Sequence, residues 1–104
     1  MPKYLLSYHG GDFPPELDAE VSAKWAKWAD AIGDRFIDRG GPLMPARTVG
    51  AGGVVSHTGR HETTGYGIIE ADTLEAAIEI AKACPQLSAP HKDGTVEVAE
   101  LIVM

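Results

Sequence analysis

Histidines are the side chains of this sequence best suited to acid–base chemistry, because an unperturbed imidazole has a pKa of about 6.5 and changes charge near neutral pH. His9 follows a β-rich segment and precedes two glycines, and His57 lies in the polar run SHTGRHETT. We interpret His9 and His57 as candidate catalytic residues that transfer protons at a small-molecule cleft. The alternative is that the loops of any soluble protein carry such polar side chains.

Candidate ligand-binding residues follow His57 in the chain. The guanidinium of Arg60 could hold an anionic group through charge-assisted hydrogen bonds, and His61 is next to it. Tyr66 stands between two glycines, where missing side chains leave room for a ligand or for close approach of the backbone. We therefore predict that Arg60, His61 and Tyr66 bind substrate, with Tyr66 forming a wall of the cleft. Ordinary packing is the alternative explanation of the two glycines.

A zinc site is the other chemistry that this stretch suggests. His57 and His61 are four residues apart, the spacing that places two ligands on one face of a helix, and Glu62 would add an oxygen donor. Thr58-Gly59 argues against a helix there. We expect solvated loop histidines, with no bound metal and no cofactor.

The composition limits the class of protein. A chain of 104 residues suits one domain, residues 1–104, and its net charge of −6 without a Lys/Arg cluster argues against nucleic acid as a partner. The single cysteine, Cys84, cannot form an intramolecular disulfide, and we interpret it as a small buried residue. The N-terminal segment lacks the pattern of a signal peptide, and no run approaches the ~20 apolar residues of a membrane span. We expect a cytoplasmic protein that does not bind membranes.

The first half of the chain predicts a strand, a helix and a hairpin. Residues 2–8 alternate as a strand that is partly apolar on both faces. A helix is expected over about 18–39, because one apolar stripe recurs there at spacings of three and four, and we expect its two tryptophans to cover a sheet. Residues 43–49 then predict an edge strand, and 54–55 extend a hairpin. The stripe consists of Val21, Trp25, Trp28, Ile32 and Phe36.

The second half carries the clearest signals. Residues 66–69 predict a strand that leads into a helix over 73–84, with Asp72 as its N-cap and Glu75 completing a capping box. Pro85 ends that helix, and residues 95–103 form the last strand.

This order of elements predicts an α+β fold of the ferredoxin-like type, the split β-α-β sandwich with βαββαβ order. Both helices should cover one face of a four-stranded antiparallel sheet. Apolar residues on the open face should bury themselves against a second copy of the chain. The topology also brings the end of the first strand and the loops 50–64 and 86–94 to one end of the sheet, together with all four histidines.

The sequence resembles the YCII-related family of small dimeric α+β barrel proteins. The resemblance is carried by MPKYLLSYHGG, by WAKWADAIGDRF with the following GGPL, by GYGIIEADTLEAAIEIAKACP, and by GTVEVAELIVM. It implies that two sheets pack face to face about a two-fold axis. Many relatives carry Asp-Gly-Pro-Phe where this chain has residues 57–62, and others carry a first-helix histidine, paired with an aspartate, that is absent near Trp25 to Trp28. The resemblance therefore implies no particular reaction.

Two classes of function follow from the sequence. The first is a small-molecule-binding homodimer, or a cofactor-free enzyme with histidine acid/base chemistry, acting on a small anionic or aromatic ligand. The second is a non-catalytic homodimeric accessory or interaction module. A cavity lined by converging side chains would favour the first class, and a filled interior would favour the second.

Overall fold

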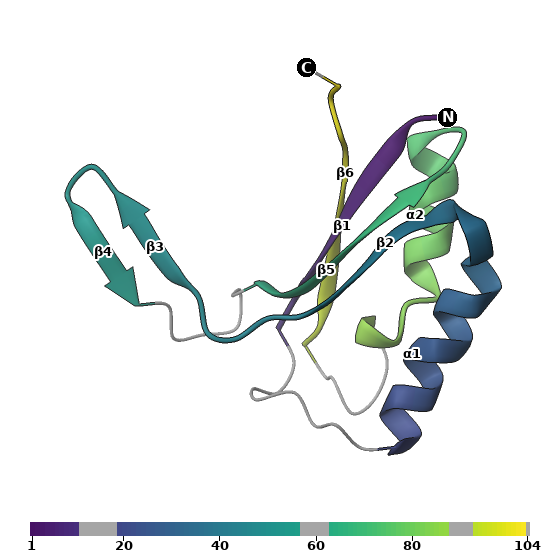
Figure 1. Cartoon of the computed structure of the whole chain (residues 1–104), viewed down its shortest axis with the longest axis horizontal. Helices are drawn as coiled ribbons and strands as arrows, with labels where there is room; N and C mark the ends of the chain where they lie inside the picture. The colour runs from purple at the N-terminus through teal and green to yellow at the C-terminus, as the bar shows by residue number, and fades with distance from the viewer. Residues whose placement is uncertain (11–18, 57–62, 88–92, 104) are drawn as a thin grey trace.

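A four-stranded antiparallel sheet with two helices on one face forms the body of the protein (Figure 1). The computed structural model describes residues 1–10, 19–56, 63–87 and 93–103. The helices are α1 (Ala19–Ile32) and α2 (Leu74–Lys82). The strands of the sheet are β1 (Lys3–His9), β2 (Phe36–Pro42), β5 (Thr63–Glu70) and β6 (Thr95–Glu100). The fold is α+β and compatible with a ferredoxin-like arrangement.

The strands lie in the order β2-β5-β1-β6, and each is antiparallel to its neighbours. Two further strands, β3 (Arg47–Gly50) and β4 (Gly53–Ser56), form a separate two-stranded hairpin. In Figure 1 this hairpin projects from the body on the side opposite the helices. The sequence analysis did not predict that the hairpin would be separate from the main sheet.

The helix-facing side of the sheet is the core. Tyr4, Leu6 and Tyr8 alternate along β1 into the layer beneath the helices and are almost inaccessible to solvent. They pack against Trp28, Ala29 and Ile32 of α1, and against Ala77 and Ala81 of α2. On the opposite side, Leu5 pairs with Ile68 of β5 and with Ala99 of β6. The expected apolar residues from the first, third and last strands of the sheet are therefore on the open face.

The first helix is shorter than the sequence predicted. It ends at Ile32, because Gly33 adopts a φ of +66°, a left-handed conformation that side chains disfavour, and a short 3₁₀ turn (Gly33–Arg35) follows. Phe36 belongs to the apolar stripe and is buried as expected, but from the first position of β2. The predicted strand over 43–49 is confirmed only at 47–49, which belong to β3, and the predicted hairpin with 54–55 is confirmed by β4; the second strand of the main sheet is β2, which starts at residue 36. Residues 43–46 instead connect β2 to the hairpin.

The second helix has a different N-cap from the predicted one. Thr73 has extended backbone geometry, and its side-chain oxygen accepts a hydrogen bond from the backbone N–H of Ala76 at 3.1 Å. Asp72 is one residue too early to satisfy this donor. The helix ends at Lys82, shortly before Pro85 begins a 3₁₀ turn (Pro85–Leu87). No helix among the described residues is long and apolar enough to cross a membrane.

Candidate ligand-binding cavity

A cavity of about 360 Å³ lies between α1 and the β2–β5 edge of the sheet, on the helical side. Apolar surface dominates it, and four aromatic rings form much of its wall. Ser22 and Ala26 of α1 line it and are exposed, so they mark its mouth. These four rings belong to Tyr8, Trp25, Trp28 and Phe36.

The four rings hold one another edge to face. The centroids of Tyr8 and Trp25 are 5.0 Å apart, those of Trp25 and Trp28 are 5.8 Å apart, and those of Trp28 and Phe36 are 5.5 Å apart. The indole N–H of Trp28 donates to the carbonyl of Ile80 on α2 at 3.2 Å, which fixes the orientation of this ring. The tryptophans cover the sheet as expected from the sequence. The same rings also wall the cavity.

Two glycines of β5 provide the space that these rings occupy. A Cβ atom at Gly67 would lie 2.7 Å from Cε1 of Phe36 and 2.9 Å from the hydroxyl of Tyr8. A Cβ atom at Gly65 would lie 3.0 Å from the ring of Tyr8. Both glycines lie at helix-facing positions of the strand. The glycines on either side of Tyr66 are therefore explained by close packing of rings against the backbone, and Gly65 also lines the cavity.

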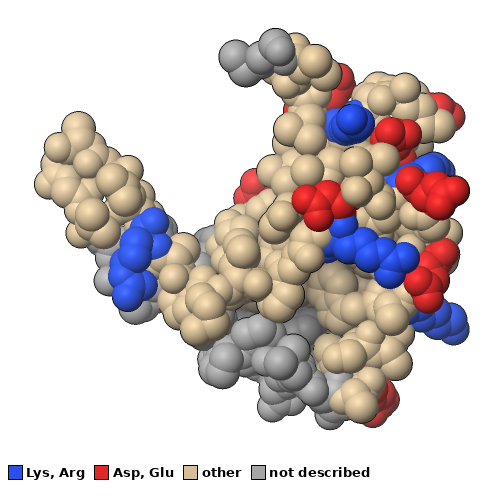
Figure 2. Space-filling view, in the orientation of Figure 1, with Lys and Arg blue, Asp and Glu red and all other residues tan. Residues whose placement is uncertain are grey.

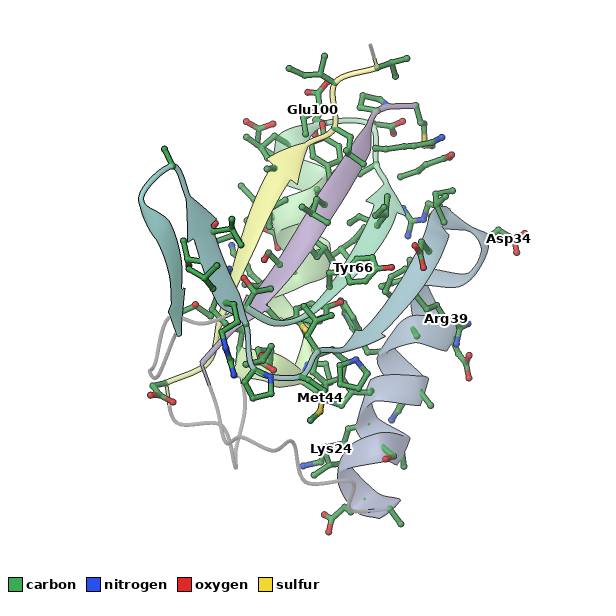
Figure 3. The ribbon with its side chains drawn as sticks, turned by 60° about the vertical axis from the view of Figure 1, so that its left-hand side comes forward. Lys24, Asp34, Arg39, Met44, Tyr66 and Glu100 are labelled. Atoms are coloured by element: carbon green, nitrogen blue, oxygen red, sulfur yellow. The ribbon has the colours of Figure 1, made fainter. Side chains whose placement is uncertain are left out.

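The charged group at the cavity is Arg39 of β2. Its guanidinium donates to a carboxylate oxygen of Asp30 on α1 at 3.1 Å, and both side chains are largely exposed. Figure 3 shows Arg39 on the side of β2 next to α1. An exposed ion pair of this kind contributes little to stability, so the guanidinium is available for exchange onto an anionic ligand.

Tyr66 borders the cavity from the adjoining strand, but its side chain lies on the open face of the sheet, because its neighbours Gly65 and Gly67 face the helices. Its hydroxyl donates to a carboxylate oxygen of Asp38 at 3.2 Å, and Figure 3 shows its ring directed toward β2. The charge of Asp38, together with this hydrogen bond, raises the pKa of the Tyr66 phenol. Burial raises the pKa of the Tyr8 phenol as well. Both phenols are therefore neutral at physiological pH and can donate or accept hydrogen bonds, but neither can act as an ionised base there.

Gln86 closes the inner end of the cavity. It is buried, and its side-chain amide donates to the carbonyls of His9 and Gly10 at 3.0 and 3.1 Å. These bonds fasten the end of β1, and so hold Tyr8 in place against the tryptophans. Cys84, two residues earlier, is buried as predicted, and burial raises the pKa of its thiol to about 12. It is therefore a protonated core residue.

His9 does not line this cavity. Its Nε2 lies 3.4 Å from a carboxylate oxygen of Glu97 on β6, and β6 is on the opposite side of β1 from β5. The other predicted site residues, His57, Arg60 and His61, lie outside the described residues. His9 pairs with Thr63 at the start of β5 and with Thr95 at the start of β6. These three strand ends therefore meet at one end of the sheet, as the topology predicted.

Sequence reasoning missed the cavity itself and Arg39 as its cation. Arg39 was the last residue of the helix predicted over about 18–39, and no role was assigned to it. No local pattern distinguishes it from the other arginines, since it reaches the cavity only because the chain turns at Gly33 and continues as β2.

The comparisons with known proteins add no assignment, since no protein-family model, curated protein or solved structure matches the chain. Among the described residues, no three His, Cys, Asp or Glu side chains come together as metal ligands.

Proposed function

We propose that this protein binds a small, largely apolar aromatic molecule that carries one anionic group. The observation behind this proposal is the cavity of about 360 Å³, walled by four edge-to-face rings and bordered by Arg39. Its volume is within the range of about 300–1,000 Å³ that is typical of small-molecule sites. Aromatic walls favour a planar ligand through stacking, and the guanidinium favours a carboxylate or a similar anion.

Binding is the function that the described lining residues support. The titratable groups among them are two phenols, whose raised pKa values keep them protonated at neutral pH, and the guanidinium of Arg39, which stays charged and does not exchange a proton in catalysis. An enzyme with His9 and His57 as acid and base remains a prediction from the sequence, as do ligand contacts by Arg60 and His61. The non-catalytic interaction module remains the alternative.

We also propose that the protein is a homodimer of the dimeric α+β barrel type, as the resemblance to the YCII-related family implies. In this arrangement the open faces of two sheets pack together about a two-fold axis. Support comes from the row of Leu5, Ile68 and Ala99, which lie next to one another on adjacent strands of the open face. The ligand cavity is on the other side of the sheet and is formed within one chain.

The ligand site is tested by calorimetric titration with a naphthalenecarboxylate and with naphthalenemethanol, its neutral analogue. Ala26 is exposed at the mouth of the cavity, so Ala26→Phe should block entry without disturbing the core. We expect this variant to lose at least tenfold in affinity for both probes. Ala23→Phe is the matched control, since Ala23 is exposed on the same helix and does not line the cavity.

Arg39→Gln tests the recognition of the anion. Exposed ion pairs contribute up to about 1 kcal/mol, so this variant should weaken binding of the carboxylate about fivefold and leave the neutral probe unchanged. Arg47→Gln, in the hairpin, is the control. If the wild-type protein binds neither probe, or if Ala26→Phe binds both as the wild type does, the proposed site is wrong.

A further inference from the structure

The β3–β4 hairpin, with the connecting residues 43–46, forms an arm that the body of the protein leaves exposed. The radius of gyration is 14.3 Å, whereas a compact chain of this length has a radius of about 13 Å. Figure 1 shows the arm projecting from the body. Among the described strands, β3 and β4 pair only with each other. An isolated two-stranded hairpin is marginally stable in water, so this arm needs a surface to pack on.

The arm is apolar where a surface loop is expected to be polar. The exposed fractions are 78% for Met44, 76% for Val49 and 64% for Val54. Val49 and Val54 are directly opposite each other in the register of the hairpin, so they form one cross-strand pair. The strands that flank the Ala51-Gly52 turn could carry polar residues at these positions and still form the hairpin. The apolar pair is therefore better explained by contact with another molecule.

The charges of the arm point to an acidic partner surface. Residues 43–56 contain Arg47 and no Asp or Glu, while the whole chain has a net charge of −6. The charged atoms that Figure 2 shows on the arm are blue, whereas red and blue are mixed over the body. The open face of the sheet carries the carboxylates of Glu97 on β6 and Glu70 on β5, since the residues next to them in each strand face the helices. A second copy of this chain therefore offers acidic groups on the face that the arm approaches.

The position of the arm also suits a second copy. The arm lies on the open-face side of the sheet, where a partner would sit in a face-to-face dimer (Figures 1 and 3). Packed sheets are ~10 Å apart, and a four-residue strand extends ~13 Å at a rise of ~3.3 Å per residue. The hairpin is thus long enough to reach past the first layer and contact the facing protomer. Two-fold symmetry would make this contact twice in each dimer.

We propose that the β3–β4 arm clasps a second copy of this chain, with Val49 and Val54 buried against the partner and Arg47 facing its carboxylates. This inference rests on the proposed homodimer and adds the element that holds it together. It does not depend on the ligand site, which lies on the opposite side of the sheet.

The experiment is sedimentation equilibrium of the full chain and of two variants over a wide range of concentration. The double variant Val49→Lys/Val54→Lys places charge on the arm at exposed positions, so it should fold normally, and its circular dichroism spectrum checks this. We expect its dimer dissociation constant to rise at least tenfold. Ile78→Lys is the control, because Ile78 is an apolar residue of α2 that is 38% exposed and lies on the helical side of the sheet, so the change should leave the dimer unchanged.

The rate of cysteine labelling on the arm independently tests whether the arm is buried in the dimer. Because Cys84 is buried, a maleimide should react at a cysteine introduced by Val49→Cys and only slowly elsewhere. The rate should increase on dilution below the dissociation constant. Lys24→Cys, on the exposed surface of α1, should react at a rate that does not depend on concentration.

The possible outcomes distinguish the proposed role of the arm from the proposed homodimer itself. A wild-type dimer whose dissociation constant is unchanged by the double lysine variant would overturn the role of the arm and leave the homodimer standing. A wild-type particle of 11.0 kDa at tens of micromolar would overturn both. Neither result would affect binding in the cavity, which the calorimetric titration measures separately.

Discussion

Replacing Gly67 by alanine should destabilise the protein, although the same change in a strand is ordinarily favourable. Gly67 lies in β5 beneath two rings of the core, and its new Cβ would be 2.7 Å from Cε1 of Phe36 and 2.9 Å from the hydroxyl of Tyr8. Both neighbours are buried, so they cannot swing into solvent. One of the two rings, or the strand, must therefore move.

The magnitude follows from two opposing effects. Overpacking of a well-packed core costs about 1–3 kcal/mol. Alanine in place of glycine restores about 0.5–1 kcal/mol by restricting the unfolded chain. The net loss should be about 1 kcal/mol, which lowers the melting temperature by about 4–8 °C for a domain of this size.

The assay compares Gly67→Ala with Gly41→Ala by thermal and urea unfolding. Gly41 pairs with Tyr66 across β2 and β5, and a Cβ there would meet no atom within 4 Å. Gly41→Ala should therefore be neutral or slightly stabilising. Because Phe36 and Tyr8 wall the cavity, Gly67→Ala should also weaken binding of the naphthalenecarboxylate. A Gly67→Ala variant as stable as Gly41→Ala would show that the rings relax freely, and would refute this account of the Gly-Tyr-Gly segment.

Two further predictions concern the second helix and the alkaline limit of stability. Thr73→Ala should cost about 1 kcal/mol in urea unfolding because it removes the N-cap, whereas Asp72→Ala should have little effect; the reverse order would restore Asp72 as the cap. Burial raises the pKa of the Cys84 thiol from 9.0 to about 12, so the folded state keeps its proton where the unfolded chain loses it. The resulting stability is complete below about pH 9 and is lost as pH rises toward about 12, with a limiting slope of about 1.4 kcal/mol per pH unit. Between pH 9 and 10, Cys84→Ala should lose stability less steeply than the wild type in urea unfolding, because titration of the tyrosines is common to both proteins, and equal slopes would contradict the assignment.

Much of the fold could be predicted from local patterns. The alternation of β1, the strand and helix between Gly65 and Pro85, and the last strand were located correctly because each combines an apolar period with clear start and stop signals. The edge position of the second strand was also predicted, but its residues were not. The apolar spacing from Val21 to Phe36 continues across Gly33 without a break, so periodicity alone could not reveal the change from helix to strand. That change depends on the left-handed conformation of Gly33, and on Gly67 of β5, whose missing side chain leaves room for the ring of Phe36.

The candidate site was predicted only in fragments. The Gly-Tyr-Gly segment indicated close approach, and Tyr66 does border the cavity. His9 did not lead to the cavity, because strand ends that share one end of a sheet need not direct their side chains to the same face. His9 is directed toward Glu97, on the side of β1 away from β5.

The sequence by itself determined which segments are strands and helices at both ends of the chain, and that the tryptophans would cover the sheet. These properties depend on residues within a few positions of one another, where periodicity and caps act directly. Tertiary structure alone decided where α1 ends, that residues 47–56 leave the sheet as an arm, and that Arg39 borders a cavity of aromatic rings. Each of these depends on contacts between distant segments, above all on rings from β1, α1 and β2 meeting over the glycines of β5. Such contacts leave no period in the sequence, because the residues that make them are brought together only by folding.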